Sequence, residues 1–449
     1  MIVPRSRLLF WFGVVVLPLT LVAAAEPSAG RAVLACLGGF AALAAVDALG
    51  ARGSLAGVGV QMPPVVRLSK DRDGRMECRI RNDRRRRKKL RVALAWPPEI
   101  EPLRDEMDLA LPDGTEWSKF TWTCRPARRG RFFLDAVYVE GRSPLGFWGA
   151  RRTLPARVEM RVYPNLMAER RNLAALFLRR GAAGLHARRQ VGKGREFEKL
   201  REYVSGDSFD EIHWKATARR GHPITKVFQI ERTQEVYVVI DASRLAARES
   251  AASRAQADSK PETALERFVT AALMLGVAAE RQGDLFGLLT FTDRVENFVR
   301  ARNGPAHYRA CRDALYTLQP KIVTPDFDEV CSFIRLRMRR RALLFFLTAL
   351  DDSLLAESFV RNVALIRRQH LVLVNMLQPP GVEPIFSNPE VSTQDDLYRR
   401  LGGHLMWQKL RELEAVLQRR GVRFKLLKDE RLSAELVTQY LGVKQRQLL

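Results

Sequence analysis

One short segment gathers the aromatic and charged side chains whose types could do chemistry. Tyr203, Asp207, Trp214, Lys215 and Arg219 lie close together in the chain. Cationic groups beside aromatic rings can bind a phosphate group or a peptide. The same residues can also be structural, with Trp214 buried against a sheet and Asp207 pairing with Lys215 or Arg219 to satisfy buried polar groups. The sequence leaves both interpretations open.

Motifs that would carry catalysis are absent from the sequence. The chain has no H-E-x-x-H metalloprotease motif, no G-x-x-x-x-G-K-[ST] phosphate loop, no G-x-S-x-G elbow and no dinucleotide fingerprint. Its 6 histidines are scattered without metal-ligand spacing, and the lone His213 is expected to be an ordinary satisfied residue. We therefore expect that the protein is not an enzyme.

The same segment carries a longer pattern of residues in a fixed order. It reads Gly194-Arg-Glu-Phe-Glu-Lys-Leu-Arg-Glu-Tyr203, then Ser205-Gly-Asp207, Ile212-His-Trp-Lys215 and Ala218-Arg219, before a strand that ends in Asp241-Ala-Ser243. This pattern resembles the signature of domain of unknown function fifty-eight, a bacterial family with a von Willebrand factor A-like domain that is often associated with MoxR-type ATPases. The signature positions in this chain are Gly194, Arg195, Glu196, Phe197, Leu200, Arg201, Tyr203, Gly206, Asp207, Ile212, Trp214, Lys215, Ala218 and Arg219.

The resemblance implies a Mg²⁺ site beside the first strand of the von Willebrand A-like domain. In the family this site uses a D-x-S-x-S motif, a later Thr and an Asp after the fourth strand, and such oxygen ligands suit Mg²⁺. Asp241 and Ser243 match the motif, and Thr324 would supply the later hydroxyl. Leu245 and Ala349 stand where the second Ser and the Asp would be. We expect these losses to weaken Mg²⁺ binding severely, so that no cofactor is required.

Two further points about this site stay open in the sequence. Asp351 and Asp352 follow the missing aspartate and could replace it only if their loop shifts. Without a metal, Asp241 and Ser243 would instead cap the following turn through hydrogen bonds to its backbone.

Apolar runs that alternate with amphipathic helices predict an α/β fold for residues 235–449. Such runs indicate a parallel sheet covered by helices on both faces, the Rossmann-type sheet of a von Willebrand A-like domain. The predicted strands are Val236–Ile240, Leu285–Phe291, Ala342–Leu347, Leu371–Leu377 and Val422–Leu427. The predicted helices are 262–281, 306–318, 326–340, 355–369, 395–420 and 433–446.

Period-two alternation predicts an antiparallel β-sandwich over residues 58–165. Met76, Cys78 and Ile80 alternate with charged residues, and several similar runs follow. Ser143-Pro-Leu-Gly-Phe147 resembles a D-P-L/F-G-L turn that many members of the family place at the end of this domain, with Ser143 in the acidic position. Residues 166–234 are expected to be a connector that includes the signature segment.

Residues 1–57 are expected to form a membrane anchor of two transmembrane helices. Leu8 to Ala25 carries no charge and is long enough to span a bilayer, and Ala32 to Val46 is a shorter apolar run. Arg5, Arg7 and Arg52 flank the two runs and place both ends of the hairpin in the cytoplasm. The alternative is a signal peptide cleaved after Ala25, with the second run still holding the chain in the membrane.

The net charge and the cysteine content narrow the range of possible functions further. The net charge of +25 is spread along the chain rather than gathered in one segment, which favours a surface facing anionic lipid over specific nucleic-acid binding. The 5 cysteines have no C-x-x-C spacing, and this indicates reduced thiols rather than a disulfide framework.

Together these features predict a multi-pass protein of the inner or plasma membrane whose soluble domains are cytoplasmic. We expect a protein–protein interaction module that binds a MoxR-type AAA+ ATPase in chaperone-like or complex-assembly work. The alternative function is a Mg²⁺-dependent von Willebrand A-type ligand-binding module.

Overall fold

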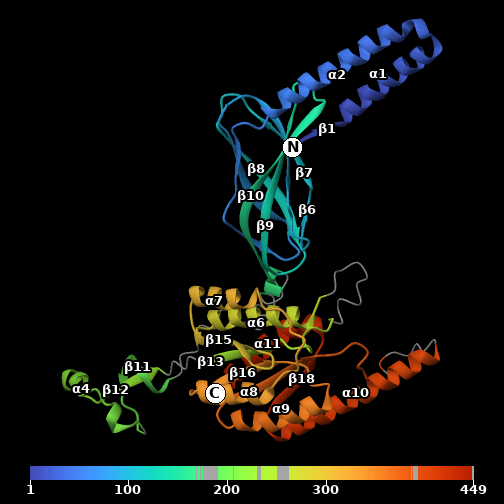
Figure 1. Cartoon of the computed structure of the whole chain (residues 1–449). Coiled ribbons are helices and arrows are strands. Elements are labelled where there is room, and N and C mark those ends of the chain that lie inside the picture. Colours follow the sequence, from blue (N-terminus) through green and yellow to red (C-terminus); the bar gives the residue numbers. More distant parts are fainter. Residues whose placement is uncertain are drawn as a thin grey trace. The chain divides into compact units, whose positions relative to one another are not determined.

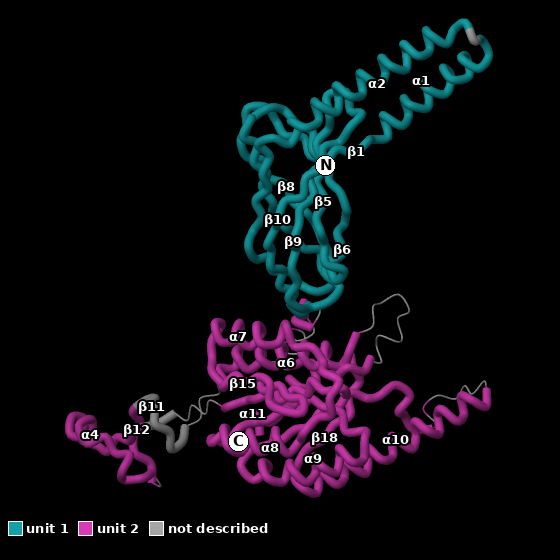
Figure 2. The backbone as a smooth tube through the Cα atoms, viewed as in Figure 1, with its two compact units in different colours: residues 1–165 teal, residues 166–449 magenta. Residues whose placement is uncertain are grey.

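The computed structural model describes residues 1–167, 169–171, 174, 191–205, 207–229, 234–249, 262–385, 387 and 393–446. The chain divides into two compact units, Met1–Asn165 and Leu166–Leu449 (Figure 2). We describe each unit by itself.

Unit 1 begins with a helical hairpin whose two helices are long and apolar enough to cross a membrane (Figure 1). Helix α1 spans Ser6–Ala25, and helix α2 spans Gly30–Arg52 after the short 3-10 helix η1, Pro27–Ala29. Helix α1 has no buried residue, and α2 buries only Val33, Asp47 and Ala51, so most of their apolar side chains are open to the surroundings, as expected for helices in contact with lipid. A three-residue strand, β1 (Ile2–Pro4), precedes α1.

The rest of unit 1 is a β-sandwich, as the alternation predicts. One sheet has the order β1-β10-β9-β5-β7, with β3 pairing on β10, and the other has the order β2-β4-β8-β6. Most neighbours are antiparallel, whereas β3 and β10 are parallel. The strands are β2 (Val58–Gln61), β3 (Val65–Ser69), β4 (Gly74–Asn82), β5 (Lys88–Leu94), β6 (Ile100–Pro102), β7 (Glu106–Leu111), β8 (Trp117–Pro126), β9 (Gly130–Arg142) and β10 (Trp148–Tyr163).

The core of the sandwich comes from the inward-facing residues of both sheets. In β4, Met76, Cys78 and Ile80 are each at most 1% exposed, while the charged residues between them face solvent. Because successive side chains of a strand point to opposite faces, this alternation fixes which face of the sheet is buried. Trp122 of β8 fills the same core, and its indole N–H donates to the Arg104 carbonyl.

Unit 2 contains a six-stranded mixed sheet with the order β15-β14-β13-β16-β17-β18. Five strands run parallel, and the edge strand β15 runs antiparallel to β14. The five predicted strands are therefore present, but the expectation of a wholly parallel sheet is wrong, because β15 follows β14 through a short turn. The strands are β13 (Glu235–Asp241), β14 (Leu285–Phe291), β15 (Val295–Arg302), β16 (Ala342–Leu347), β17 (Leu371–Leu377) and β18 (Arg423–Leu427).

Helices cover both faces of this sheet (Figure 1). Helices α6, α7 and α11 share one hydrophobic core with the sheet, and α8, α9 and α10 share the other. In β13, Val236, Val238 and Ile240 enter the first core and Tyr237 and Val239 the second, which is why this strand lacks polar alternation. The helices are α6 (Ala264–Arg281), α7 (Pro305–Leu315), α8 (Phe327–Arg337), α9 (Ser353–Ile366), α10 (Gln394–Arg419) and α11 (Leu432–Gln445), with the 3-10 helix η4 (Asp429–Arg431) before α11.

The signature segment folds as a small module of its own secondary structure. Strands β11 (Val191–Glu202) and β12 (Ile224–Gln229) form a two-stranded antiparallel sheet. Between them lie the 3-10 helix η3 (Phe209–Glu211) and the short helix α4 (Trp214–Arg220). We call residues 199–229 the signature module.

Candidate functional site

Asp207 is the residue that holds the turn of the signature module together. One carboxylate oxygen accepts a hydrogen bond from the Arg201 guanidinium at 2.6 Å, and the other accepts from the Val204 N–H at 3.0 Å and the Thr225 hydroxyl at 3.3 Å. The Val204 N–H, aided by Arg201, keeps the pKa of Asp207 below its usual value. Asp207 therefore pairs with Arg201, and not with Lys215 or Arg219 as the structural interpretation expected.

Local signals set the bounds of α4. His213 is the N-cap, and its Nδ1 accepts a hydrogen bond from the Ala216 N–H at 3.1 Å. Gly221 ends the helix at φ +73°, in the left-handed region that favours glycine. Thr217 accepts from the Ile224 N–H at 3.0 Å and so ties the helix to β12. His213 thus has a capping role, in line with the expectation that it is satisfied.

Helix α4 presents one face made of signature residues. Trp214 and Ala218 are four residues apart, as are Lys215 and Arg219, so the two pairs lie side by side on the helix. All four residues are exposed, and Trp214 is 69% exposed. Phe209, just before the helix, is 74% exposed and stacks on Tyr203 with 6.0 Å between ring centroids. The indole of Trp214 is therefore not a core side chain among the described residues.

Some of the remaining signature residues have described surroundings within the signature module, and the others lie outside the described residues. Ile212 is 7% exposed and bridges to Thr225, whereas Leu200 is 41% exposed. The backbone of Gly194 to Phe197 lies in β11, where Glu196 pairs with Gln229 and Phe197 with Phe228. The side chains of Arg195, Glu196 and Phe197, and the whole of Gly206, lie outside the described residues.

Asp241 and Ser243 lie together at the carboxyl end of β13. Both are fully buried. Asp241 accepts hydrogen bonds from the Thr348 hydroxyl at 2.6 Å and the Ser243 N–H at 2.8 Å, and the Ser243 hydroxyl accepts from the Leu245 N–H at 3.3 Å. The two side chains therefore cap the turn that follows the strand. Sequence reasoning missed Thr348, although it directly follows the strand β16 that lies beside β13.

The other residues of the predicted metal site have different surroundings. Thr324 is exposed, in a loop that hydrogen-bonds to the Asp241 turn through Val323. Asp351 forms an ion pair with Arg248. Asp352 is the N-cap of α9 and accepts from the Leu354 and Leu355 N–H groups at 2.9 and 3.4 Å. Both carboxylates that could have replaced the missing aspartate thus have other partners.

The residues present do not fit a Mg²⁺ site of the type that the resemblance implies. Leu245 is 2% exposed and offers no oxygen ligand from its side chain, and Ala349 offers none either. A cation at Asp241 would also have to displace the Thr348 hydroxyl from a carboxylate that is already satisfied. No group of three His, Cys, Asp or Glu side chains that could hold a metal occurs within the described part of the chain.

Comparison with known proteins bears on the segment that holds both candidate sites. Residues 199–383 match the family described as Protein of unknown function DUF58. This DUF58 match begins within the signature module and continues through Asp241, Ser243 and Thr324, and it supports the family that the signature indicated. None of the curated proteins matches the chain.

Several solved structures are similar to the chain at low identity. The PilB minor pilin from Streptococcus sanguinis is 10% identical, with 80% of this chain and 88% of the pilin covered and a TM-score of 0.33. The conserved hypothetical protein BatB from Bacteroides thetaiotaomicron is 13% identical, covering 47% of this chain and 99% of BatB, with a TM-score of 0.29. An aerotolerance-related membrane protein from Bacteroides fragilis is 10% identical, with coverage of 46% and 98% and a TM-score of 0.29. TM-scores this low do not establish a shared fold.

The buried carboxyl group of Asp241 in the DUF58 segment should make stability depend on pH. Burial raises the pKa of Asp241 above its ordinary value. The folded state then holds a proton that the unfolded state has lost, so stability should fall as the pH rises from about 4 through the folded pKa. Asp241→Asn removes this titration, and its stability relative to wild type should therefore improve as the pH rises.

Thermal unfolding of the full chain in detergent over a pH series would measure this difference. Asp352→Asn, at a carboxylate that solvent reaches, is the matched control for loss of one negative charge. A difference between Asp241→Asn and wild type that stays constant with pH would show that Asp241 does not titrate in this way.

A surface groove of about 530 Å³ lies along β18 and α11, apart from both candidate sites. Arg423, Lys425 and Arg446 line it together with Glu435, which pairs with Lys425. Neither the signature residues nor Asp241, Ser243 and Thr324 contribute to its lining.

Proposed function

We propose that this protein is a membrane-anchored, non-enzymatic interaction protein that binds its partner through the signature module. The observation that carries the proposal is the exposed face of α4, formed by Trp214, Lys215, Ala218 and Arg219. Burying an exposed tryptophan beside cations is a common way for a protein surface to gain binding energy, since Trp and Arg are enriched in interface hot spots.

The charges around this face favour a protein partner over a lipid surface. Lys215 and Arg219 lie on the helix, whereas Asp210 and Glu211 lie beside the exposed Phe209 in η3. A bilayer with anionic lipids would repel the two carboxylates, while a folded partner can match both signs of charge. The partner surface should therefore carry an apolar pocket for Trp214 with acidic groups around it.

By family resemblance, the partner is a MoxR-type AAA+ ATPase, and the work is chaperone-like or assembles complexes. The same resemblance makes the α/β domain von Willebrand A-like. Its central strand β13 ends in Asp241-Ala-Ser243, and open α/β sheets usually place their ligand sites at such strand ends. The replacements at Leu245 and Ala349 favour an interaction that does not depend on Mg²⁺ over the metal-dependent alternative.

The soluble domains are proposed to face the cytoplasm. Strand β1, before the first apolar helix, pairs with β10 of the sandwich, and Ile2 lies opposite Ala150. Two spans place both ends of the hairpin on one side of a membrane, and Arg5, Arg7 and Arg52 favour the cytoplasmic side. Cleavage after Ala25 would remove β1 from the sheet, so this pairing favours an uncleaved first helix.

The decisive experiment is affinity capture of the full chain from native membranes, followed by identification of the proteins that copurify. We expect a MoxR-type AAA+ ATPase among them. Trp214→Ala should reduce its recovery by about tenfold or more, because loss of a central interface tryptophan costs at least about 1.4 kcal/mol of binding. The melting temperature should change little, since the side chain is exposed.

Tyr398→Ala is the matched control. Tyr398 lies in α10 of the same unit and is 71% exposed, close to the exposure of Trp214. It should leave recovery of the ATPase unchanged. Capture that never enriches an ATPase of this type would reject the partner, and equal recovery with Trp214→Ala would reject the α4 face as the binding surface.

A further inference from the structure

The membrane helices of unit 1 are fixed directly to the β-sandwich. Only residues 53–57 separate the end of α2 from β2, and β1 joins the sandwich sheet just before α1 begins. Arg5 connects the start of α1 to the sandwich, since its backbone N–H donates to the Phe147 carbonyl at 2.9 Å and its side chain pairs with Glu140 at 3.3 Å. The sandwich therefore has little freedom to move away from the helix ends.

The turn Ser143–Phe147 packs along one face of α2. The ring of Phe147 lies 6.2 Å from that of Phe40, and the Trp148 indole N–H donates to the Ala44 carbonyl at 2.8 Å. Asp47, one turn further along the same face, binds the turn itself. Gly50, beyond it, leaves room for the ring of Pro144, which would lie 3.0 Å from any Cβ at that position.

These contacts place the turn beside the end of the apolar run of α2. Phe40 and Ala44 lie within the run Ala32 to Val46, and the length from Phe40 to Val46 is roughly 9 Å at 1.5 Å per residue. Arg7, just before the apolar run of α1, lies close to the turn at Gly146, where its side chain would be 3.5 Å from an added Cβ. The turn therefore lies at the depth where both apolar runs end.

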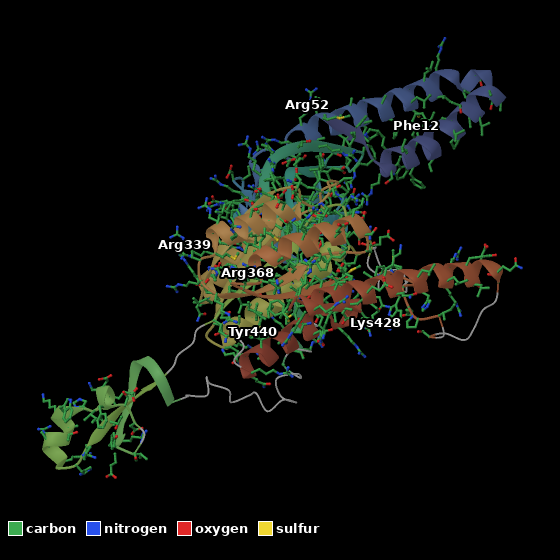
Figure 3. All side chains as sticks on the ribbon, turned by 90° about the horizontal axis from the view of Figure 1, so that it is seen from below. Phe12, Arg52, Arg339, Arg368, Lys428 and Tyr440 are labelled. Atoms are coloured by element: carbon green, nitrogen blue, oxygen red, sulfur yellow. The ribbon has the colours of Figure 1, made fainter. Side chains whose placement is uncertain are left out.

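Leu145, at the tip of this turn, is 47% exposed. Its N–H donates to Asp47 at 2.8 Å, so the backbone of this leucine is held at the end of the span. Arg7 and Arg52 are exposed at the same two helix ends, and Trp11 on α1 is 45% exposed (Figure 3 labels Arg52, and Phe12 next to Trp11). Aromatic rings and guanidinium groups around an apolar side chain are typical of the interface between lipid tails and headgroups.

We propose that the Ser143–Phe147 turn is a third membrane contact of this protein, in addition to the two helices. Leu145 enters the outer part of the lipid tails, and the Arg7 and Arg52 guanidinium groups bind lipid phosphates around it. The β-sandwich therefore contacts the bilayer surface directly and is not held away from it by a linker. This inference rests on the membrane anchoring in the proposed function and does not depend on the partner.

Fluorescence of single-site thiol labels can test the depth of Leu145. The full chain would be reconstituted in phosphatidylcholine vesicles that contain phosphatidylglycerol. A polarity-sensitive dye would be placed at native Cys36, which is exposed within the apolar run of α2, or at Leu145→Cys or Leu103→Cys in a Cys36→Ser background. The other cysteines are buried and should react poorly. Leu103 is 76% exposed, and its N–H donates to the carbonyl of Thr123, which lies opposite Arg75 of β4. Strand β2, which follows α2, pairs with the other end of β4, so Leu103 lies away from the helices.

We expect the label at 145 to emit at shorter wavelength than the label at 103. Quenching of the 145 label by aqueous iodide should be several-fold weaker than at 103, while lipids with a spin label near the headgroup should quench it strongly. Spin labels deep in the lipid tails should quench the dye at Cys36 more strongly than the dye at position 145 or 103. This order of depths, with 103 in water, would support the proposal.

Two results would overturn the proposed membrane contact of the turn, and each would identify a different part of the proposal as wrong. If the 145 label is as accessible to iodide as the 103 label while Cys36 is shielded, the helices span the membrane and the turn stays in water. If Cys36 is accessible as well, the membrane anchoring fails and the proposal fails with it.

Discussion

Replacing Asp47 by alanine should lower the free energy of unfolding of unit 1 by about 3–5 kcal/mol, because two buried donors and one partly buried donor lose their acceptor. Asp47 is 3% exposed and accepts from the Ser143 hydroxyl at 2.6 Å and from the Leu145 and Phe147 N–H groups at 2.8 and 3.1 Å. The Ser143 hydroxyl and the Phe147 N–H are buried between α2 and the turn, where water would not easily replace the carboxylate. The loss should therefore be larger than for an ordinary surface aspartate.

Urea titration of the full chain in detergent, followed by tryptophan fluorescence, would measure this loss. Unit 1 dominates the signal, since it contains Trp11, Trp96, Trp117, Trp122 and Trp148. Asp47→Asn keeps one oxygen acceptor and should cost less, about 1–2 kcal/mol. An alanine variant as stable as wild type would show that the carboxylate does not hold the turn.

A second-site variant tests the geometry more sharply. The resemblance places an acidic residue at position 143, where this chain has Ser143, and the structure shows that α2 supplies a carboxylate to the same turn instead. Asp47→Ala combined with Ser143→Asp returns a carboxylate to the turn and should recover part of the lost stability. No recovery would mean that the carboxylate is needed specifically on α2, as the link between helix and sandwich.

The secondary structure of this chain could be predicted because its patterns are local. Four of the five parallel strands are short, mainly apolar runs, whereas the edge strand β18 also contains Arg423 and Lys425. The residues of β4 alternate between apolar and polar, and their burial follows the same period of two. Strand β15 was missed because Val295–Arg302 mixes polar and apolar residues, as an edge strand does. The short turn Thr292–Arg294 before it was the available signal, since so few residues can only join antiparallel neighbours.

The candidate sites could be predicted only in part, because they depend on contacts between distant residues. The capping role of Asp241 and Ser243 is local and was among the expectations, whereas the Thr348 hydroxyl comes from the residue after strand β16, far along the chain. In the same way, the sequence shows Asp47 only as a charge next to the end of the apolar run Ala32 to Val46. Its partners lie in a turn that the sequence cannot place. Whether Trp214 is buried or exposed is also a tertiary property that spacing does not determine.

Asp284→Ala should destabilise unit 2 by about 3–5 kcal/mol, because it leaves a partly buried ammonium group without its counter-charge. Asp284 is 2% exposed and precedes β14. It accepts from the Tyr440 hydroxyl, from Lys444 Nζ at 2.8 Å and from the Gln234 N–H at 3.1 Å. It thus connects α11, on which Figure 3 labels Tyr440, to the start of β13.

A double-mutant cycle with Lys444→Met separates the two parts of this loss. Lys444 also donates to the Gln282 carbonyl at 3.0 Å, so its own removal should have a cost. If the unpaired ammonium group causes most of the effect, the double variant should be more stable than the sum of the single losses, with a coupling of about 0.5–3 kcal/mol. If the loss of stability in the double variant equals the sum of the two single losses, the effect of Asp284→Ala comes instead from the lost hydrogen bonds of Tyr440 and Gln234, which do not involve Lys444. Either result measures how firmly α11 is held over the sheet that carries Asp241.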